Sequence, residues 1–173
     1  MNTYYTIEEK YLQATDKLNY GKTPKALQLL NEIVSNDPLY ARAHHQLGKI
    51  YYYDLEDYQT AGYHFKTCME IEPAFPGNYF HYLHLVVFLN MEKQVALIAE
   101  KALITPGVDI AEIYDLLGLS AEKNRHLEKA LKAYNKAFEI VTEKSDREKI
   151  EDSIKRVTAK MQLNNAYRYT LVE

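Results

Sequence analysis

The chain has 173 residues, of which 47% are hydrophobic and 26% charged, enough apolar material for the core of one ordinary domain. Lys and Arg number 21 against 24 Asp and Glu, a net charge of −3 without long like-charge runs, which excludes the basic surface typical of nucleic-acid and polybasic membrane binders. One cysteine, a start without a secretory pattern and no long apolar run predict a cytoplasmic protein without a membrane span.

The scarcity of helix breakers predicts an all-α fold. The sequence has only 6 Gly and 5 Pro, and no Trp, but 16 Tyr. Apolar residues recur at spacings of three and four rather than two, which is typical of amphipathic helices. The stretches between breakers hold roughly a dozen residues, close to the mean length of globular helices. We therefore expect many short helices.

Two patterns recur along the chain with one common period. Leu47-Gly48-x-x-Tyr51 returns as Leu117-Gly118-x-x-Ala121, so that one whole unit fits between the two copies. A small residue followed by a larger one and another small one occurs four times. These sets begin at Ala26, Ala61, Val95 and Ala130. Such a regular recurrence indicates a stacked helical repeat.

This pattern resembles the tetratricopeptide repeat (TPR), a helix-turn-helix of about 34 residues with the pattern W-x2-L-G-x2-Y, then A-x3-F, then P. The resemblance implies a right-handed α-solenoid that forms a single domain. The predicted repeats are 7–40, 41–75, 76–110 and 111–144.

The first three repeats fit the pattern to different degrees. Repeat 1 leaves two registers open for its first helix, one with Lys10, Gln13, Ala14 and Lys17 on the packed face and one with Tyr11, Ala14, Thr15 and Leu18. Repeat 2 matches best, with Pro73 at its end and one extra residue in the turn 54–57. Repeat 3 lacks the glycine. Proline cannot continue a helix, so Pro38 and Pro73 are expected to follow the second helices of their units.

The fourth repeat and the C-terminus complete the pattern. Gly118 and Ala130 in repeat 4 are expected to let its two helices approach closely. Beyond it, Ile150, Ile154, Val157 and Met161 form one apolar stripe. Solenoids need a terminal element that covers the last apolar face. Residues 146–163 are therefore predicted to be a capping helix, followed by a tail at 164–173 that either extends the helix or is extended.

The resemblance also implies a concave groove lined by the first helix of each repeat. Its face is expected one residue beyond each packed stripe, so that the groove is basic at repeat 2, aromatic and imidazole-rich at repeat 3 and acidic at repeat 4. Glu112 lies on this face, and the predicted ligand-binding residues are Arg42, His45, Lys49, Tyr52, Phe80, His81, His84, Phe88, Asp115, Leu119 and Glu122.

The same residues allow other interpretations. His45, His81 and His84 together resemble a zinc site, but groove histidines are common, and no metal or other cofactor is predicted. The sequence has no phosphate loop and no hydrolase motif, and Cys68 takes the place of a small buried residue, so no catalysis is expected. His64 and His126 are expected at the surface, on a second helix and in a turn.

These features predict a non-catalytic scaffold for protein–protein interaction that binds a protein or an extended peptide, as a monomer or weak homodimer. Some TPR domains hold the C-termini of chaperones with a set of lysines and asparagines. This sequence does not have that set at the matching positions. Two alternatives stay open. One is a small chaperone for exported proteins, similar in fold to those of type III secretion, and the other is a self-associating structural unit.

Overall fold

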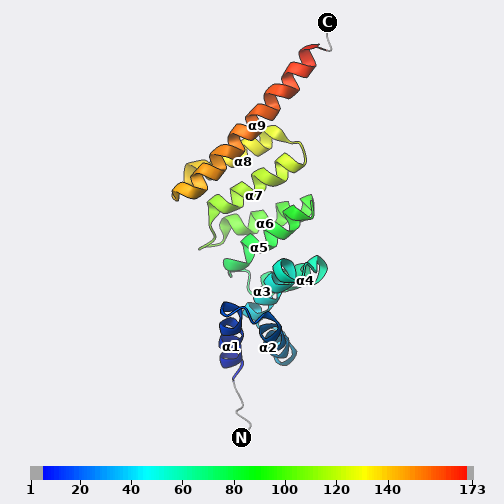
Figure 1. The fold of residues 1–173 in the computed structure, drawn as a ribbon, viewed down its shortest axis with the longest axis vertical. Coiled ribbons are helices and arrows are strands. Elements are labelled where there is room, and N and C mark those ends of the chain that lie inside the picture. The colour runs from blue at the N-terminus through cyan, green and yellow to red at the C-terminus, as the bar shows by residue number, and fades with distance from the viewer. Residues whose placement is uncertain (1–5, 171–173) are drawn as a thin grey trace. The chain divides into compact units, whose positions relative to one another are not determined.

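The computed structural model describes the backbone of residues 6–170 and the side chains of residues 6–163. Every regular element in this part of the chain is helical, which confirms the predicted all-α class (Figure 1). In chain order the helices are α1 (Ile7–Asn19), α2 (Thr23–Asn36), α3 (Ala41–Lys49), the π-helical turn η1 (Ile50–Asp54), α4 (Tyr58–Ile71), α5 (Gly77–Phe88), α6 (Glu92–Ile104), α7 (Ile110–Lys123), α8 (Leu127–Ile140) and α9 (Lys144–Thr170).

The chain divides into two compact units, residues 1–85 and 86–173. The first unit holds α1 to α4 and most of α5, and the second holds the end of α5 and α6 to α9. Each predicted repeat contains one pair of helices. The second helices α2 and α4 end at Asn36 and Ile71, shortly before Pro38 and Pro73, as the prolines predict.

The turn inside each helix pair has the same backbone form. One residue in each turn has a positive φ: Gly21 at 67°, Glu56 at 53°, Asn90 at 56° and Arg125 at 60°. These positions recur with the same spacing as the small residues that open the second-helix pattern. Only the first is glycine, so three of the four turns hold a side chain in the left-handed region and gave no sequence signal.

In the second unit, α8 packs between α7 and α9. Ala130, Tyr134 and Ala137 of α8 are buried together with Ile150 and Val157 of α9. Ile154 and Met161 of α9 pack against the same cluster and are partly buried, so all four residues of the predicted stripe lie at this interface.

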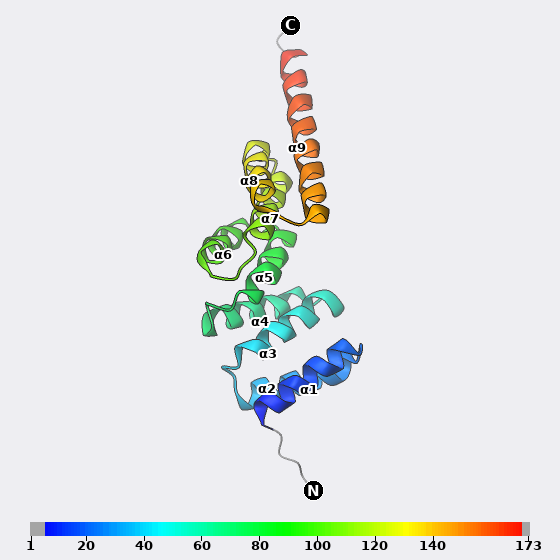
Figure 2. The ribbon, with the colours of Figure 1, turned by 90° about the vertical axis from the view of Figure 1, so that its left-hand side faces the viewer.

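The last helix is longer than the predicted segment 146–163. It begins at Lys144 and continues through most of the predicted tail to Thr170, while residues 171–173 lie outside the described part of the chain. Figure 2 shows its C-terminal end, in red, extending beyond α8.

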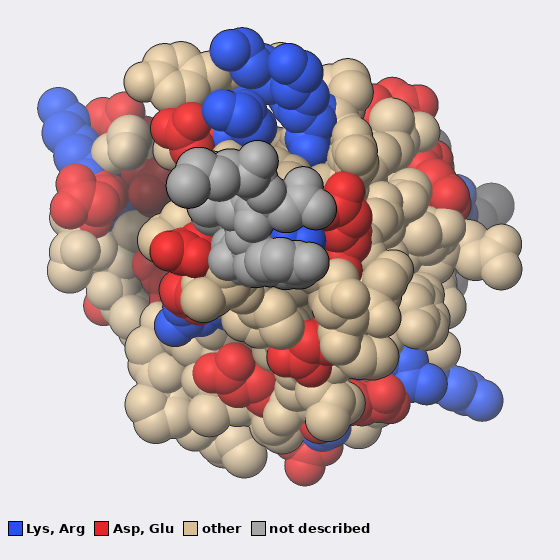
Figure 3. All heavy atoms as spheres, turned by 90° about the horizontal axis from the view of Figure 1, so that it is seen from below, with Lys and Arg blue, Asp and Glu red and all other residues tan. Residues whose placement is uncertain are grey.

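Charged side chains of both signs are mixed on the surface. On the face drawn in Figure 3, Lys and Arg lie among Asp and Glu, and neutral residues occupy much of the area. This mixing agrees with the small net charge of −3.

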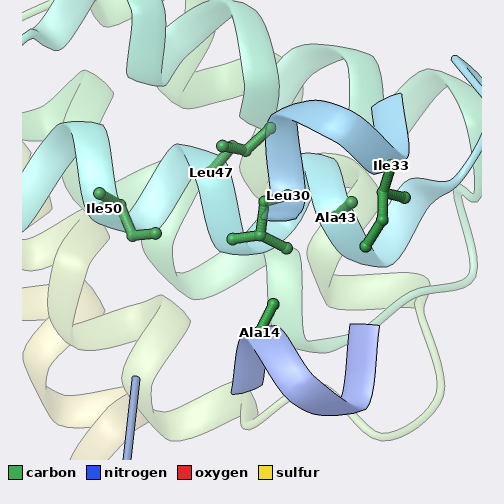
Figure 4. Close-up of a cluster of buried hydrophobic side chains, with 6 residues drawn as sticks. All are labelled: Ala14, Leu30, Ile33, Ala43, Leu47 and Ile50. Carbon is green, nitrogen blue, oxygen red and sulfur yellow. The ribbon is translucent and has the colours of Figure 1, made fainter. Parts of the chain in front are cut away.

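The core of the first unit joins its first three helices. Ala14, Leu30, Ile33, Ala43, Leu47 and Ile50 form one buried cluster (Figure 4). Ile7, Tyr11 and Leu18 of α1 pack against it, so the register with Tyr11, Ala14 and Leu18 on the packed face is the one adopted. Lys10, from the other register, instead forms an ion pair with Glu32 of α2 at 3.3 Å.

Candidate functional site

The extra residue of the second repeat is absorbed at the end of α3. After Lys49 the helix widens into the π-helical turn η1, in which the Leu55 N–H donates to the Ile50 carbonyl at 3.1 Å. The Asp57 N–H then donates to the Tyr51 carbonyl at 2.9 Å, and Asp57 caps α4 through its side chain. Short π-helical segments in α-helices are frequent at functional sites. This turn redirects the three consecutive tyrosines 51–53.

Two of these tyrosines meet histidines of α5 within the first unit. The Tyr52 hydroxyl lies 2.6 Å from His84 Nδ1, and the Tyr53 hydroxyl lies 2.9 Å from His81 Nδ1. The Phe80 ring stands 5.3 Å from the His81 ring and 5.9 Å from the His84 ring, measured between centroids. The predicted aromatic and imidazole-rich surface is thus one connected group of rings.

The residues of this group differ in burial: some lie beneath the surface and support it, and others are exposed on it. Tyr52 is 7% exposed, whereas Tyr53 is 47% exposed. Burial, with smaller contributions from the neighbouring Tyr53 and Tyr58, raises the pKa of Tyr52 to about 12. Tyr52, predicted to face the groove, instead supports the surface from below. Tyr53, which was not among the predicted residues, takes its place.

His45 also lies beneath the predicted surface. It is 6% exposed, and its Nδ1 is 3.4 Å from Asn78 Oδ1, while the Asn78 amide donates to the Phe65 carbonyl at 2.8 Å. Burial, with a smaller contribution from Lys49, lowers the pKa of His45 to about 4 against the opposing effect of the hydrogen bond with Asn78. His81, partly buried, has its pKa lowered to about 3 by burial and then by His45, Lys49 and His84. Both imidazoles are neutral at pH 7, so they contribute no positive charge.

Lys49 and Arg42 are therefore the two cations of the predicted basic region. Arg42 is exposed and lies 3.5 Å from the carboxylate of Glu8, on α1. Lys49 is partly exposed, and its ammonium forms no hydrogen bond or ion pair with any residue the structure describes. It lines a pocket of about 360 Å³ in the first unit, together with Thr15, Leu18, Asn19, Thr23, Gln46, Ile50, Tyr53 and Asp54.

In the predicted acidic region of the second unit, one negative charge is neutralised by ion pairs within the protein. Glu122 of α7 is 9% exposed, and its carboxylate accepts from Arg156 Nε and Nη2 of α9, both at 2.8 Å. Lys160 of α9 donates to it at 2.7 Å and the Tyr134 hydroxyl at 2.9 Å. The hydrogen bonds from Arg156, followed by those from Lys160 and Tyr134, lower the pKa of Glu122 to about 2. Glu122 was expected to face an open groove, but α9 supplies its counterions instead.

The other predicted residues of the second unit are more open. Asp115 is partly buried, and Phe88 and Leu119 are 51% and 37% exposed. Burial raises the pKa values of Asp115 and Glu112, and neighbouring carboxylates raise them further. Lys123 of α7 donates to the carbonyls of Val87 and Phe88 at 2.7 and 2.9 Å, so it caps the end of α5.

His64 is not at the surface, contrary to the sequence prediction. It is 7% exposed because it pairs with His44, 4% exposed, with 2.9 Å between their Nδ1 atoms. His44 Nε2 lies 3.0 Å from the Pro38 carbonyl, which can only accept, so His44 carries its proton on Nε2 and its Nδ1 accepts a hydrogen bond from the His64 Nδ1–H. His44 is neutral in this arrangement, and burial lowers the pKa of both rings. His126 is exposed, as predicted.

The residues considered for a metal site do not assemble into one. Within residues 6–163, no three His, Cys, Asp or Glu side chains are grouped so that they could hold a metal ion. His81 and His84 are instead hydrogen-bonded to tyrosines. Cys68 is buried, and burial raises the pKa of its thiol to about 12.

Paired short helices with small residues at their contacts, and exposed rings on the first helices of a unit, define a helical-repeat scaffold. The tetratricopeptide repeat family model matches residues 41–75 and 111–140, so these two segments are tetratricopeptide repeats and the predicted family is confirmed. A comparison with curated protein sequences gives no significant match. No helix in the described part of the chain has the length and hydropathy needed to cross a membrane.

Solved structures share the fold at low sequence identity. A crystal structure of MamA protein is 19% identical, with a TM-score of 0.78 over 95% of this chain and 87% of that chain. A thermophilic TPR protein from Thermus thermophilus is 20% identical, with a TM-score of 0.67 over 88% of this chain and 83% of that chain. PilW, a type IV pilus biogenesis factor, is 18% identical, with a TM-score of 0.66 over 76% of this chain and 60% of that chain. The α-solenoid fold predicted from the sequence is therefore confirmed.

Proposed function

We propose that this chain is a non-catalytic interaction module and that its first unit binds a segment of another protein on the face formed by α3, η1 and α5. We call the exposed and half-buried residues of this face the first-unit surface, and it consists of Lys49, Tyr53, Phe80, His81 and His84. Exposed aromatic side chains and an unpaired cation are common anchors of protein interfaces.

One observation carries the proposal. The rings of Tyr53, His81, Phe80 and His84 are held by contacts with one another, including the Tyr53–His81 hydrogen bond, and by the hydrogen bond between the buried Tyr52 and His84, although the surface they present is partly open. A preordered aromatic surface loses little side-chain entropy on binding, because its rotamers are already restricted. Such a surface suits a partner segment with apolar or aromatic side chains.

The remaining predicted residues have separate roles in this proposal. Arg42 lies at the edge of the first unit, paired with Glu8, and can add a rim contact. Phe88, Asp115 and Leu119 form a second contact region, in the second unit. His45 and Tyr52 act as supports, and Glu122 belongs to the contact between α7 and α9.

The test is capture of partners from the native lysate with the full chain and two variants. The double variant Tyr53→Ala/Phe80→Ala removes the exposed rings of the first-unit surface. The matched control Leu97→Ala/Ile104→Ala removes two exposed apolar side chains of the second unit, which are 51% and 79% exposed.

We expect specific partners to be retained by the wild type and the control and to be lost from the first-unit variant, with circular dichroism showing that all three are folded. Equal retention by all three proteins would contradict the proposed binding face.

A further inference from the structure

A pocket in the second unit lies between the second helices α6 and α8, with α7 as its floor. The residues that α7 contributes are mostly buried or partly buried, whereas those at the rim on α6 and α8 are exposed. Its volume of about 250 Å³ is below the range of about 300–1,000 Å³ that is usual for small-molecule pockets, a size that suits one large side chain. The lining residues are Glu92, Val95, Ala96, Leu117, Ser120, Ala121, Asn124, His126, Lys129 and Ala133.

Two aromatic rings stand at the equivalent positions of the first unit. Tyr51 and Ala121 are separated by two repeat periods, and so are His64 and Ala133. The rings of Tyr51 and His64 are stacked, with centroids 5.6 Å apart and planes 10° apart. The pocket therefore lies where the second unit has alanine in place of both rings.

The same helix pair holds a ring two turns away from the pocket. The Lys136 ammonium of α8 lies over the Tyr114 ring of α7, 5.0 Å from its centroid. Because the two helices of a pair run antiparallel, two turns back along α8 lead to Lys129 and two turns forward along α7 lead to Ala121. Lys129 is exposed, and its side chain has no hydrogen bond, ion pair or ring contact with the residues that the structure describes. The lysine is thus present at the pocket, but the ring that it could cover is replaced by alanine.

One buried polar group faces the pocket without a partner. Ser120 is 8% exposed and lines the pocket, and its hydroxyl forms no hydrogen bond with any residue in the described part of the chain. Every fully buried side-chain nitrogen or oxygen there has a hydrogen-bond partner, so the Ser120 oxygen is open to the pocket rather than sealed in the core. A largely buried hydroxyl is stabilised when a ligand supplies the missing hydrogen bond. This favours an occupant with a polar end over a purely apolar one.

We propose that this pocket binds a tyrosine side chain from a segment of another protein. The ring lies against Ala121 and Ala133 with the Lys129 ammonium over its face, and its hydroxyl bonds to Ser120. Glu92 and Lys129 leave the lining without net charge, which suits a neutral side chain. This site is separate from the first-unit surface and so goes beyond the proposed function.

The experiment titrates the ¹⁵N-labelled full chain with three capped pentapeptides and follows the amide resonances by NMR, a method that detects weak binding. The peptides have glycine and serine around a central residue, which is tyrosine, phenylalanine or leucine. We expect the tyrosine peptide to shift the backbone amides of the pocket lining. It should bind about threefold more tightly than the phenylalanine peptide, which lacks the hydroxyl, and more tightly still than the leucine peptide, which lacks the ring.

Two variants test the assigned contacts. Ser120→Ala should remove the preference for tyrosine over phenylalanine, and Lys129→Met should weaken binding of the tyrosine peptide about threefold. Lys132→Met is the matched control, because Lys132 is exposed on α8 and does not line the pocket. The first-unit variant Tyr53→Ala/Phe80→Ala should bind the tyrosine peptide like the wild type.

A third variant supplies the ring from the chain itself. Ala121→Tyr introduces the residue that repeat 2 has at this position. We expect it to fill the pocket, to abolish the peptide shifts and to leave the midpoint of thermal unfolding unchanged or raise it by a few degrees. Ala137→Tyr is the matched control, since Ala137 is 0% exposed and does not line the pocket, so a ring there should overpack the core and lower the midpoint.

Three results would overturn the proposal: equal binding of the tyrosine and leucine peptides, shifts that persist in Ala121→Tyr, or a midpoint of Ala121→Tyr as low as that of Ala137→Tyr. If no peptide shifts the pocket resonances but partner capture still depends on Tyr53 and Phe80, the pocket assignment fails and the proposed function stands. Self-association of the wild type that Ala121→Tyr abolishes, measured by light scattering, would make a second copy the occupant and contradict the assignment to another protein.

Discussion

The two glycines of the leucine-glycine pairs define how closely their helices approach. A Cβ on Gly48 would lie 2.6 Å from Cδ1 and Cε1 of Phe65, and a Cβ on Gly118 would lie 2.6 Å from the same atoms of Tyr134. Phe65 and Tyr134 are 0% and 1% exposed, so neither ring has free space into which to move. The same contact is therefore used in the second and the fourth repeat.

We expect Gly118→Ala to destabilise the second unit by about 1–3 kcal/mol, because the added methyl group overpacks the contact with Tyr134. Gly118→Leu should cost more. The control is Gly62→Ala, where the new Cβ would meet only Leu85 at 3.8 Å, so the helix propensity of alanine should leave stability unchanged or raise it by about 0.5–1 kcal/mol. Urea unfolding monitored by circular dichroism measures both. Equal midpoints for Gly118→Ala and the wild type would contradict the close contact.

Glu122 connects three helices through a single carboxylate. It accepts from Arg156 and Lys160 of α9 and from Tyr134 of α8, while it is itself on α7. Because its pKa in the folded protein is lowered to about 2, the folded state holds the charged form more strongly than the unfolded state does. Its contribution to stability is therefore complete above pH 5 and is lost as the pH falls towards 2.

Glu122→Gln should lower the free energy of unfolding by on the order of 2–3 kcal/mol at pH 7, the usual size for buried hydrogen bonds to charged groups. The difference between wild type and variant should shrink as the pH is lowered from 5 to 2.5. Thermal melts over this range measure it, and Glu148→Gln, which removes an exposed carboxylate paired with Lys144, is the control and should change little. A difference that does not depend on pH would show that packing rather than charge explains the loss.

At the scale of an element, α9 takes the position of a first helix one repeat period after α7. Glu122 and Arg156 are separated by one repeat period, and they pair directly. The positions of α9 that correspond to the packed stripe of α7, one period later, are Glu148, Glu151, Asp152 and Lys155, which are exposed and form ion pairs along the helix. A charged face at these positions gives a further helix no apolar surface to pack on, as expected of a capping helix.

Truncation after Lys144 should make the chain aggregate or melt early. It uncovers the apolar residues of α8 and removes the buried side chains of Ile150 and Val157, whose burial alone represents at most about 3–6 kcal/mol. It also leaves Glu122 without Arg156 and Lys160.

The matched control for this truncation ends at Asn164, because it keeps Ile150, Ile154, Val157 and Met161. We expect it to melt close to the full chain. Light scattering and thermal melts compare the three proteins, and a chain ending at Lys144 that is as monomeric and heat-resistant as the full chain would contradict the capping role.

For the whole molecule, the histidines are distributed unevenly between the two units. His44, His45, His64, His81 and His84 belong to the first unit, and His126 belongs to the second. In the first unit, burial lowers the pKa of His44, and burial together with the neighbouring His44 lowers the pKa of His64 to about 4. No carboxylate forms an ion pair with either ring in the described residues, and the groups that face them are Tyr51, Tyr63 and the Pro38 carbonyl.

A lowered histidine pKa means that the unfolded state binds more protons between pH 6.5 and 4. Stability from the neutral histidines is therefore complete above pH 6.5 and is lost as the pH falls towards 4. Because repeat proteins are stabilised by local terms, we expect the first unit to lose stability first, by about 1–2 kcal/mol per buried histidine between pH 6.5 and 5.

Native-state hydrogen exchange of the full chain at pH 6.5 and 5, corrected for intrinsic exchange, measures the effect separately in residues 6–85 and 86–170. The double variant His44→Phe/His64→Phe should reduce the pH dependence in α3 and α4. An equal loss of protection in both units would contradict the prediction.

The sequence by itself determined the helical class and the repeat, because both depend on residue spacing. The repeat period, the small residues at the helix contacts and the prolines after α2 and α4 are local patterns that a single chain displays. The stripe of α9 and the approach at Gly48 and Gly118 followed from the same spacing.

Only the tertiary structure decided which predicted residues of the candidate site are open, because burial depends on neighbouring helices. Glu122 is covered by cations of α9, and His64 is buried by a histidine of the preceding helix α3. The residue inserted at the π-helical turn rotates the side chains that follow it, so Tyr53 rather than Tyr52 is exposed on the predicted surface. The matching positions Thr15 with Lys49 and Asn19 with Tyr53 were present in the sequence, but only the packing of α1 against α3 shows that they enclose a pocket.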